Sequence, residues 1–498
     1  MIKTPLAIIG SGFGGIGLAI KLQEAGYTDF LILEKANDVG GCWRDNHYPG
    51  AACDVPSHLY SFSFEPKFDW SRKFAPQREI HAYIRHCADK YNLWPHIRLN
   101  TEVTGASFDD ARGVWRIATA NGETVEATVL VPACGQLSRP AYPRLPGLDR
   151  FEGECFHSAH WHDGADVRGK RVAVIGTGAS AIQFVPELVK QASALTLFQR
   201  TAPYVIPKPD RPYSRLEQKA YETLPLLQAL SRTGMYWQHE SRALVFGPVK
   251  QLMRVFEWDF KRHLNAAVKD PELRRKLTPD YPMGCKRILI SNDYYTALAK
   301  PHVAVETGAI REVTAKGVRT ADGVEHAADV IVYGTGFQAT DFLAPMQITG
   351  RHGVSLNQAW RDGAEAYLGI TVHGFPNLFM LYGPNTNLGH NSIVFMLERQ
   401  FGYILQALDA LRERGLQWVE VRAETQGRFN RWVQDSIRKT VWEDGCTSWY
   451  KTDSGKNTNN WPGFTLAYRW RTRHFEIGDY EALPQTAVQP AGLRLAAG

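Results

Sequence analysis

The sequence has no long uncharged apolar run and few cysteines for its 498 residues. No run approaches the ~18 apolar residues that a membrane-spanning helix needs, so a bilayer span is not expected. The seven cysteines are an odd number, and their scattered positions match no metal-ligand spacing, so no metal site is expected either. The first predicted strand begins almost at Met1, which leaves no room for a signal peptide. Together these absences predict a reduced, cytoplasmic protein without structural disulfides.

The chain also lacks a large excess of charge of one sign. Lys and Arg number 57 against 51 Asp and Glu, which gives a net charge of +6, and the basic residues do not gather into a stripe. A nucleic-acid-binding surface is therefore not expected. The hydrophobic share, 44%, is that of an ordinary globular protein, and the length corresponds to about three domains of ~150 residues each.

Two glycine-rich motifs in the same register are the clearest positive feature. Gly10-Ser11-Gly12-Phe13-Gly14-Gly15 follows the apolar run 6–9, and Gly176-Thr177-Gly178-Ala179-Ser180-Ala181 follows the apolar run 172–175. Between a strand and a helix, such glycines allow a pyrophosphate to approach the helix N-terminus. One copy would be weak evidence, because glycine turns also occur for packing reasons. Two copies predict two dinucleotide-binding folds.

The two motifs end on opposite charges. Twenty-four residues after the first glycine stands Glu34 in the first motif and Arg200 in the second. A carboxylate at this position holds the ribose hydroxyls of a dinucleotide, whereas an arginine accommodates a 2′-phosphate. We therefore expect FAD near Glu34 and NADPH near Arg200.

The expected fold class is α/β, with two Rossmann-like dinucleotide-binding domains, the second of which carries a helical insertion. Prolines between 140 and 147 mark a linker, and residues 213–282 have apolar positions at helical spacing with little glycine. Strands are expected at 287–290 and 378–381, and a helix at 393–411. The expected boundaries are 1–140 and 345–498 for the FAD-binding domain, 141–164 for the linker, 165–207 and 284–344 for the NADP-binding domain, and 208–283 for the insertion.

The polar side of the insertion is rich in Lys and Arg. Such a helical face is compatible with a role at a membrane surface. A solvated helical face is the favoured interpretation, because charged residues on a helix usually face water.

A longer pattern lies between the two glycine motifs. Residues 151–161, Phe-Glu-Gly-Glu-Cys-Phe-His-Ser-Ala-His-Trp, fit F-x-G-x-x-x-H-x-x-x-W, and His162 follows where proline or aspartate is usual. A second pattern comprises Gly40-Gly41-Cys42-Trp43, Tyr48-Pro49-Gly50 and Asp54. Both resemble the fingerprints of the type I, flavin-dependent Baeyer–Villiger monooxygenases. The resemblance extends along nearly the whole chain, to Trp449 at least.

The resemblance implies an activity. A Baeyer–Villiger monooxygenase uses NADPH and O₂ to form a peroxide at the flavin C4a carbon, and this peroxide inserts one oxygen atom next to a ketone carbonyl to give an ester or lactone. Thioether oxidation is expected as an additional reaction. The implied catalytic residues are Arg287, whose charge would keep the peroxide anionic and stabilise an oxyanion, and Asp54, which would pair with it. From residue type alone, both could be unrelated surface charges, and Asp54 could cap a helix.

The resemblance also implies a set of cofactor-binding residues. Arg200 and Lys286 would converge on the 2′-phosphate of NADPH. Trp449 would contact the nucleotide, although a Trp-Tyr pair also fits core packing. The full set is Gly10, Gly12, Phe13, Gly15, Glu34, Gly41, Cys42, Trp43, Asp54, Tyr60, Val103, Ile393, Thr177, Gly178, Ala179, Ser180, Gln183, Arg200, Thr201, Lys286, Arg287 and Trp449.

Several alternatives stay open at this point. His157 could be a general base, but the resemblance favours a hinge within the linker. The same cofactors would serve an enzyme that oxygenates sulfur or nitrogen. A disulfide reductase would need a redox cysteine pair, and Cys42 and Cys53 are eleven residues apart. A non-catalytic NADPH sensor would bind the cofactors without turnover. The identity of the ketone and the oligomeric state are not predicted.

Overall fold

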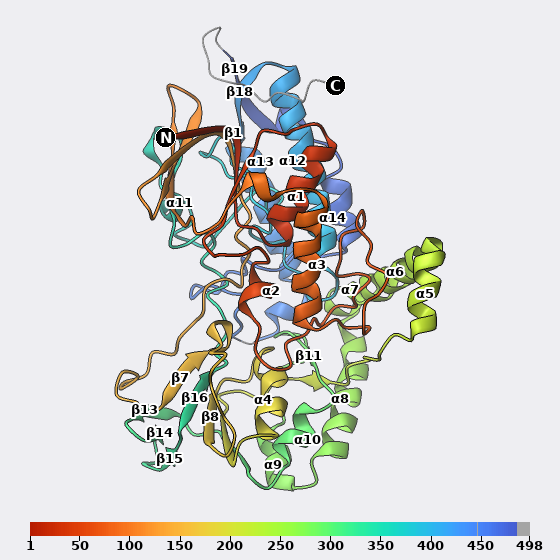
Figure 1. The fold of residues 1–498 in the computed structure, drawn as a ribbon, viewed down its shortest axis with the longest axis vertical. Helices are drawn as coiled ribbons and strands as arrows, with labels where there is room; N and C mark the ends of the chain where they lie inside the picture. Colours follow the sequence, from red (N-terminus) through yellow and green to blue (C-terminus); the bar gives the residue numbers. More distant parts are fainter. Residues whose placement is uncertain (446, 486–498) are drawn as a thin grey trace.

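The computed structural model describes residues 1–445 and 447–485, which form two α/β lobes with helices packed around them (Figure 1). The N-terminal lobe occupies the upper half of this view and the second lobe the lower half. Cys446 and residues 486–498 lie outside the described part. Among the described helices, none is long and apolar enough to cross a bilayer.

The first lobe is built on a seven-stranded sheet. In spatial order its strands are β17 (Gln347–Thr349), β4 (Val103–Asp109), β5 (Val114–Thr119), β6 (Thr124–Pro132), β1 (Ile2–Ile9), β2 (Leu31–Leu33) and β3 (Ile97–Arg98). The strands β6, β1, β2 and β3 run parallel, and β5 pairs antiparallel with both β4 and β6. The run of buried side chains from Leu6 to Ile8 is typical of a parallel strand covered on both faces.

Most helices of the first lobe follow or flank this sheet. They are α1 (Phe13–Glu24), α2 (Cys42–Asp45), α3 (Gln77–Lys90), α11 (Leu356–Ala359), α12 (Ile393–Glu413), α13 (Ala423–Ile437) and α14 (Thr465–Arg471), with the hairpin pair β18 (Leu416–Val421) and β19 (Tyr480–Pro484). The helix predicted at 393–411 is confirmed as α12. It packs so closely on α1 that a Cβ at Gly17 would lie 2.6 Å from the Phe401 ring.

The second lobe is built on a five-stranded parallel sheet. Its strands are, in spatial order, β12 (Val303–Glu306), β9 (Ala194–Phe198), β8 (Arg171–Ile175), β16 (Val330–Tyr333) and β7 (Glu154–His157). One face is covered by α4 (Ala181–Val189) and α10 (Tyr294–Leu298), and the other by a small sheet of β13 (Ile310–Thr314), β14 (Gly317–Thr320) and β15 (Glu325–Ala327). The edge strand β7 comes from the stretch expected as linker, so that stretch completes the sheet.

Helices fill the region expected as an insertion. They are α5 (Arg215–Thr223), α6 (Pro225–Glu240), α7 (Ala243–Phe246), α8 (Met253–Ala267) and α9 (Pro271–Lys276), and they stand between β10 (Val205–Ile206) and β11 (Leu289–Ile290). Figure 1 shows α5 and α6 projecting from the body at the right, and α8 beside the second lobe. The apolar pattern of α8 is buried at Phe260 and Leu264, but Val255 is 61% exposed.

Two predicted strands are shorter than expected. Residues 378–381 run beside β6 but form only an isolated bridge from Leu378 to Leu130. Positive φ angles at Asn377 (51°) and Tyr382 (58°) bend the backbone at both ends and prevent a longer ladder. Of residues 287–290, only Leu289 and Ile290 form a strand, and they pair with β10 outside the five-stranded sheet.

The cysteines require one correction. Cys42, Cys53, Cys87, Cys134 and Cys155 are free thiols, as expected for a reduced protein. Cys285 is disulfide-bonded, so the prediction of a chain without structural disulfides is wrong. Sequence spacing did not indicate this bond, because a disulfide depends on approach in space.

Candidate active site

A cavity of about 1170 Å³ lies at the carboxyl ends of the parallel strands of both lobes. Ligands of open α/β folds bind at this end of the sheet. Every catalytic and cofactor-binding residue predicted from the sequence lines this cavity except Gly15. The lining residues from that prediction are Gly10, Gly12, Phe13, Glu34, Gly41, Cys42, Trp43, Asp54, Tyr60, Val103, Ile393, Thr177, Gly178, Ala179, Ser180, Gln183, Arg200, Thr201, Lys286, Arg287 and Trp449.

In the first glycine turn, backbone atoms approach the glycines so closely that a side chain would not fit. Gly10 has a φ of +101°, and a Cβ there would lie 2.9 Å from the Ala133 carbonyl oxygen. A Cβ at Gly15 would lie only 2.0 Å from the Gly10 carbonyl oxygen. Gly15 therefore serves close packing of α1 on β1, which is the role of the third glycine in such motifs and explains why it does not line the cavity.

Both turns lead into helices whose N-termini have no side-chain cap. Gly12, which has no side chain, precedes α1. Ser180 precedes α4, and its side chain accepts no hydrogen bond from that helix. The first N–H groups of a helix need an acceptor, and an anion at the helix N-terminus supplies one. In the second turn, a Cβ at Gly176 would lie 2.3 Å from the Gly334 carbonyl oxygen. The two turns thus offer glycine-lined, uncapped sites that fit two dinucleotides.

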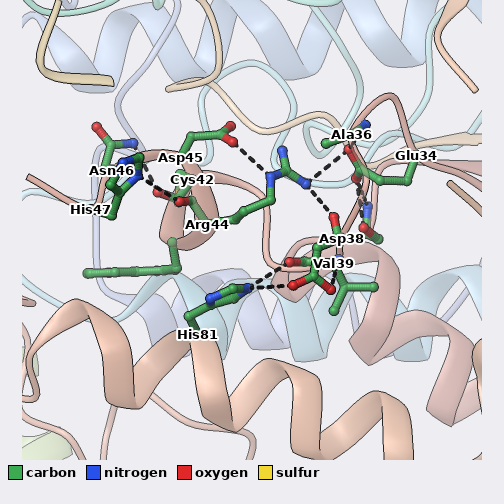
Figure 2. A network of polar contacts seen from close by, with 12 residues as sticks. Glu34, Ala36, Asp38, Val39, Cys42, Arg44, Asp45, Asn46, His47 and His81 are labelled. Atoms are coloured by element: carbon green, nitrogen blue, oxygen red, sulfur yellow. Dashed lines mark hydrogen bonds and ion pairs between the residues drawn. The ribbon is translucent and has the colours of Figure 1, made fainter. Parts of the chain in front are cut away.

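Glu34 lies just after β2 and is 4% exposed. Its Oε2 accepts hydrogen bonds from the Ser11 backbone N–H at 3.0 Å and the Ser11 hydroxyl at 2.7 Å. Its Oε1 accepts from the Ala36 N–H at 3.0 Å and lies 3.1 Å from Arg44 Nη1, as Figure 2 shows. A carboxylate has about four lone-pair sites, and all four are taken here. A ribose hydroxyl pair would therefore replace at least one donor, and the Ser11 hydroxyl is free to rotate away.

Arg44, on α2, links the Glu34 carboxylate to the loop that follows Glu34 and to Asp45. Its Nη1 donates to the Asp38 carbonyl at 2.6 Å and its Nε donates to Asp45 at 2.8 Å. His81 on α3 lies 3.0 Å from the Val39 carbonyl (Figure 2). The loop after Glu34 is thereby fixed from two sides.

Arg287 and Asp54 form an ion pair inside the cavity. Arg287 Nε donates to Asp54 Oδ2 at 3.0 Å, and Nη2 donates to the same oxygen. The charge of Asp54 raises the pKa of Arg287. Burial alone would raise the pKa of Asp54, but the charges of Arg287 and Lys208 hold it below its usual value. Both groups are therefore charged at neutral pH, and the surface-charge alternative is wrong because both line the cavity.

Lys286 and Arg200 lie on the second-lobe side of the cavity. Burial and the charge of Arg200 both lower the pKa of Lys286, and its Nζ lies 4.4 Å from the centre of the Tyr281 ring. Neither cation forms an ion pair within the described residues, which is an arrangement that a phosphate would stabilise. Thr177 donates to the Thr201 carbonyl at 3.0 Å and holds the adjacent turn.

Gln183 joins the two lobes. Its Oε1 accepts from the Tyr48 hydroxyl at 3.0 Å and its Nε2 donates to the Ala52 carbonyl at 2.9 Å. Gly50 has a φ of +83°, and a Cβ there would lie 2.6 Å from the Gln183 carbonyl oxygen. Trp161, the last residue of the first fingerprint, packs on Phe184 in the same contact, with ring centres 5.8 Å apart. The fingerprint residues Tyr48 to Gly50 and Trp161 thus meet where the lobes touch.

Aromatic rings form much of the remaining wall. Trp43 donates to the Tyr60 hydroxyl at 3.1 Å, and Phe13 packs on Tyr60 with ring centres 5.2 Å apart. Trp449 is 37% exposed and packs on the buried Tyr450. The core-packing alternative therefore describes Tyr450, while Trp449 faces the cavity.

His157 does not line the cavity. It is fully buried at the end of β7, where its Nδ1 accepts from the Ala159 N–H at 3.1 Å. Burial lowers its pKa to about 4. Its position at the junction of β7 and the following turn fits a structural role in the linker and contradicts contact with a substrate in this cavity.

The wall before α12 is fixed by a residue of the insertion. Asn391 Nδ2 and Thr465 Oγ1 each donate to Oε2 of the buried Glu240 at 2.7 Å, and the Leu466 N–H donates to Oε1 at 3.0 Å. Asn391 Oδ1 in turn accepts from the Ser392 N–H at 2.8 Å, next to the start of α12. Glu240 thus holds together α6, the cavity wall and α14.

Sequence reasoning missed three residues of this region. Arg44 directly follows the predicted Gly41–Trp43 and could have been found by that position. Tyr382 lines the cavity at the end of an expected strand, where its hydroxyl donates to Asn387 at 2.7 Å. Glu240 carried no local signal, because its partners Asn391 and Thr465 are 151 and 225 positions away.

Comparison with known proteins places this arrangement in a family. A model described as pyridine nucleotide-disulphide oxidoreductase matches residues 7–224. The chain is 49% identical to a Baeyer–Villiger monooxygenase of Pseudomonas aeruginosa, over 95% of this chain and 90% of that protein. It is 46% identical to a Baeyer–Villiger monooxygenase of Streptomyces coelicolor, over 97% of this chain and 93% of that protein. The chain belongs to the Baeyer–Villiger monooxygenase family.

The chain has the fold of this family over nearly its whole length. A crystal structure of OTEMO in complex with FAD and NADP matches with a TM-score of 0.87 at 29% identity, covering 96% of this chain and 99% of that chain. The fold class predicted from the sequence, with two Rossmann-like domains, is confirmed. Cys42, Cys53 and Cys134, the cysteines that line the cavity, are free and are not joined to one another.

Proposed function

We propose that this protein is an NADPH-dependent monooxygenase that inserts one atom of O₂ next to a ketone carbonyl and so forms an ester or lactone. The observation that carries the proposal is the Arg287–Asp54 ion pair in a cavity between two glycine-lined dinucleotide sites. Its membership in the Baeyer–Villiger family supports the same reaction. NADPH is a cytoplasmic reductant, so the cytoplasm is the proposed location.

The two cofactors would be held by opposite sides of the cavity. The Gly10–Gly15 turn, the N-terminus of α1 and Glu34 would hold FAD, within a domain of residues 1–140 and 345–498. The turn at Gly176, the N-terminus of α4, Arg200 and Lys286 would hold NADPH, within a domain of residues 165–207 and 284–344. When bound, the cofactors supply the electrons and the activation of O₂.

The protein's own contribution to the chemistry is a fixed positive charge. A guanidinium has five N–H groups, and Asp54 accepts two of those of Arg287. The remaining three are available to a carbonyl oxygen or to the oxyanion that develops when the carbonyl is attacked. A preorganised donor of this kind stabilises the developing charge. Asp54 keeps Arg287 charged and oriented, and the aromatic wall restricts water.

The test is turnover by purified, FAD-loaded protein with NADPH and a panel of linear, cyclic and aryl ketones. We expect ketone-stimulated NADPH oxidation and an ester or lactone product, detected by gas chromatography. NADPH oxidation that yields only hydrogen peroxide across the panel would refute the proposal. Tight cofactor binding without any stimulated turnover would instead indicate the NADPH sensor.

We also propose thioether oxidation as a secondary reaction of the same site. A protein that mainly oxygenates sulfur or nitrogen is the alternative, and it has no need of a cation poised for a ketone oxyanion. Aryl methyl thioethers and tertiary amines in the same assay separate the two. Faster turnover of these substrates than of every ketone would favour the alternative.

A further inference from the structure

The outward face of α6 is covered with large apolar side chains. Leu226 is 71% exposed, Leu230 59% and Trp237 55%, and these positions repeat along one side of the helix. Leu224 and Leu227 beside them are 57% and 41% exposed. Monomeric proteins rarely expose contiguous apolar surface of this kind without a partner for it.

This face carries no charge. Between residues 223 and 239 the only charged side chain is Arg232, and it points inward, where its Nη1 donates to the Ser61 carbonyl at 2.9 Å. On the same inner side, His58 lies 3.2 Å from the Ser231 hydroxyl and Glu240 binds Asn391. The polar groups of α6 thus fasten it to the first lobe, which leaves its leucines outward. The expectation that a charged face of the insertion would be solvated does not describe α6.

A group of exposed arginines, which we call the arginine patch, lies on α13, on α14 and just after the end of α14. Its members are Arg428, Arg431, Arg469, Arg471 and Arg473. Ion pairs in this region, such as Arg438–Asp435, do not include them, and none of the five has an acidic partner in the described residues. The Arg471 guanidinium lies 3.8 Å from the centre of the Trp432 ring, which joins the two helices. Trp470 in the middle of the patch is 61% exposed.

The arginine patch is next to the apolar face. The Tyr236 hydroxyl on α6 lies 3.0 Å from Thr465 Oγ1 at the start of α14. Burial raises the pKa of Tyr236, and the charge of Arg469 opposes that rise, so Arg469 is close to α6 as well. Figure 1 shows α14, α5 and α6 on the same side of the molecule. The apolar face of α6 and the arginine patch thus lie on elements that contact each other, and together they are the candidate surface.

We propose that this surface binds the headgroup region of an anionic lipid bilayer. Exposed Leu and Trp insert into the boundary between headgroups and acyl chains, and clustered arginines attract anionic headgroups. The helix does not span the bilayer but lies on it. Nucleic acid is a poorer fit, because the exposed leucines would find no partner on it. A second copy of the chain would bury the leucines but would not by itself supply anionic groups to the arginines, and the test below distinguishes this occupant from lipid.

The test is vesicle flotation of the FAD-loaded protein at ~0.15 M salt. The vesicles are phosphatidylcholine alone, or phosphatidylcholine with roughly one third phosphatidylglycerol. We expect binding to the anionic vesicles, weak binding to phosphatidylcholine alone, and release at about 1 M salt. Leu226→Gln/Leu230→Gln and Arg469→Glu/Arg473→Glu are each expected to weaken binding by about tenfold or more.

Matched controls carry the same kinds of substitution, apolar to Gln and Arg to Glu, at exposed positions outside the proposed surface. Val324→Gln/Val354→Gln replaces exposed apolar residues, and Arg275→Glu/Arg311→Glu reverses exposed charges. Both should bind vesicles as the unaltered protein does. Bound FAD and Tm establish that each variant is folded.

Four results would overturn the proposal. The first three are failure of the unaltered protein to bind anionic vesicles, equal binding to both vesicle types, and unchanged binding by both surface variants. The fourth is a dimer, seen by light scattering, that Leu226→Gln/Leu230→Gln dissociates, since a second copy would then cover the face. Binding of the arginine patch to nucleic acid but not to vesicles counts with the first of these.

Discussion

Arg287 carries the charge on which the proposed reaction depends. It is held by one oxygen of Asp54, so part of its guanidinium remains directed to the cavity. This arrangement separates two steps. Reduction of the flavin by NADPH does not need a donor for a ketone oxyanion, whereas oxygen insertion does.

Substitution of Arg287 should therefore affect the two steps differently. We expect Arg287→Ala to reduce ester formation by about 100-fold or more, the usual cost of removing a preorganised oxyanion donor. NADPH oxidation should be largely retained and should yield hydrogen peroxide. Arg287→Lys should keep the charge but lose the fork that Asp54 binds, and so fall in between. Measurement of ester and peroxide per NADPH tests this, and a parallel loss of both activities would contradict the assigned role.

Arg200 and Lys286 should determine the preference for NADPH over NADH. Loss of a hydrogen bond between charged groups costs about 1.5–3 kcal/mol, so Arg200→Gln should raise KM for NADPH by roughly 10- to 100-fold. KM for NADH should change little. Arg168→Gln, an exposed arginine already paired with Asp166, is the control and should change neither. An equal rise in both KM values would show that Arg200 does not contact the 2′-phosphate.

Residue identities in the site were predictable where a motif fixed their spacing. Glu34 and Arg200 followed from their distance to the glycines, and both line the cavity. The four donors around Glu34 were not predictable, because Arg44 reaches it through a helix whose position depends on the whole lobe. Gly15 was predicted as a cofactor-binding residue together with the other motif glycines, but it packs against Gly10 and does not line the cavity.

At the scale of elements, Glu240 joins three of them. Both of its oxygens accept hydrogen bonds, so a glutamine in its place must turn an NH₂ group toward a donor whichever way its amide is oriented. A buried donor left without an acceptor costs about 1–3 kcal/mol. Glu240→Gln should therefore lower the free energy of unfolding by that amount and lower Tm.

The matched control for this prediction is Glu222→Gln on α5. Glu222 is exposed and pairs with Lys219 at 3.0 Å on the surface, where such a pair contributes little. Differential scanning calorimetry of both variants with FAD bound is the measurement. If Glu240→Gln melts at the same temperature as Glu222→Gln, the network does not hold these elements together.

Elements were predictable where local pattern and packing agree. The strand-turn-helix units at both glycine motifs and α12 have apolar periodicity that their environment matches. The expected strand at 378–381 failed because backbone bends at Asn377 and Tyr382 depend on contacts with distant segments. The helical pattern of residues 213–282 predicted the helices of this region, including α6, but it did not predict that the leucines of α6 would be exposed.

At the scale of the whole molecule, several buried histidines make stability depend on pH. Burial lowers the pKa of His58, His157 and His239 to about 4 and that of His390 to about 3. In the unfolded chain each titrates near ~6.5, so below that pH the unfolded state binds more protons. Their contribution is complete above pH ~6.5 and is lost as pH falls toward 4, by up to about 1.4 kcal/mol per pH unit for each histidine.

Urea unfolding at several pH values between 7.5 and 4.5 measures this slope. Buried carboxylates such as Asp54 add a loss of the same sign at low pH, so the slope alone does not identify the histidines. His390→Leu removes one of them. Among the described residues neither nitrogen of His390 has a hydrogen-bond partner, and Nε2 lies 3.9 Å from the Glu240 carboxylate. We expect this variant to show a shallower slope between pH 6.5 and 4.5. An unchanged slope would mean that folding does not lower the pKa of His390.

The overall architecture was predictable because two copies of one motif, with opposite charges at matched positions, define two nucleotide-binding lobes. How the lobes meet was not predictable. Gln183, Tyr48 and Gly50 make that contact through hydrogen bonds and a close backbone approach that no spacing rule encodes. The cavity exists only because of this contact, since its lining comes from both lobes.

The most direct test of the central claim is oxygen labelling. The FAD-loaded protein is incubated with NADPH, a ketone that stimulates turnover, and ¹⁸O₂ in unlabelled water, and the product is analysed by mass spectrometry. We predict an ester or lactone that carries one ¹⁸O atom as its new ring or chain oxygen. An ester without label, or labelled hydrogen peroxide with the ketone unchanged, would contradict oxygen insertion by this site.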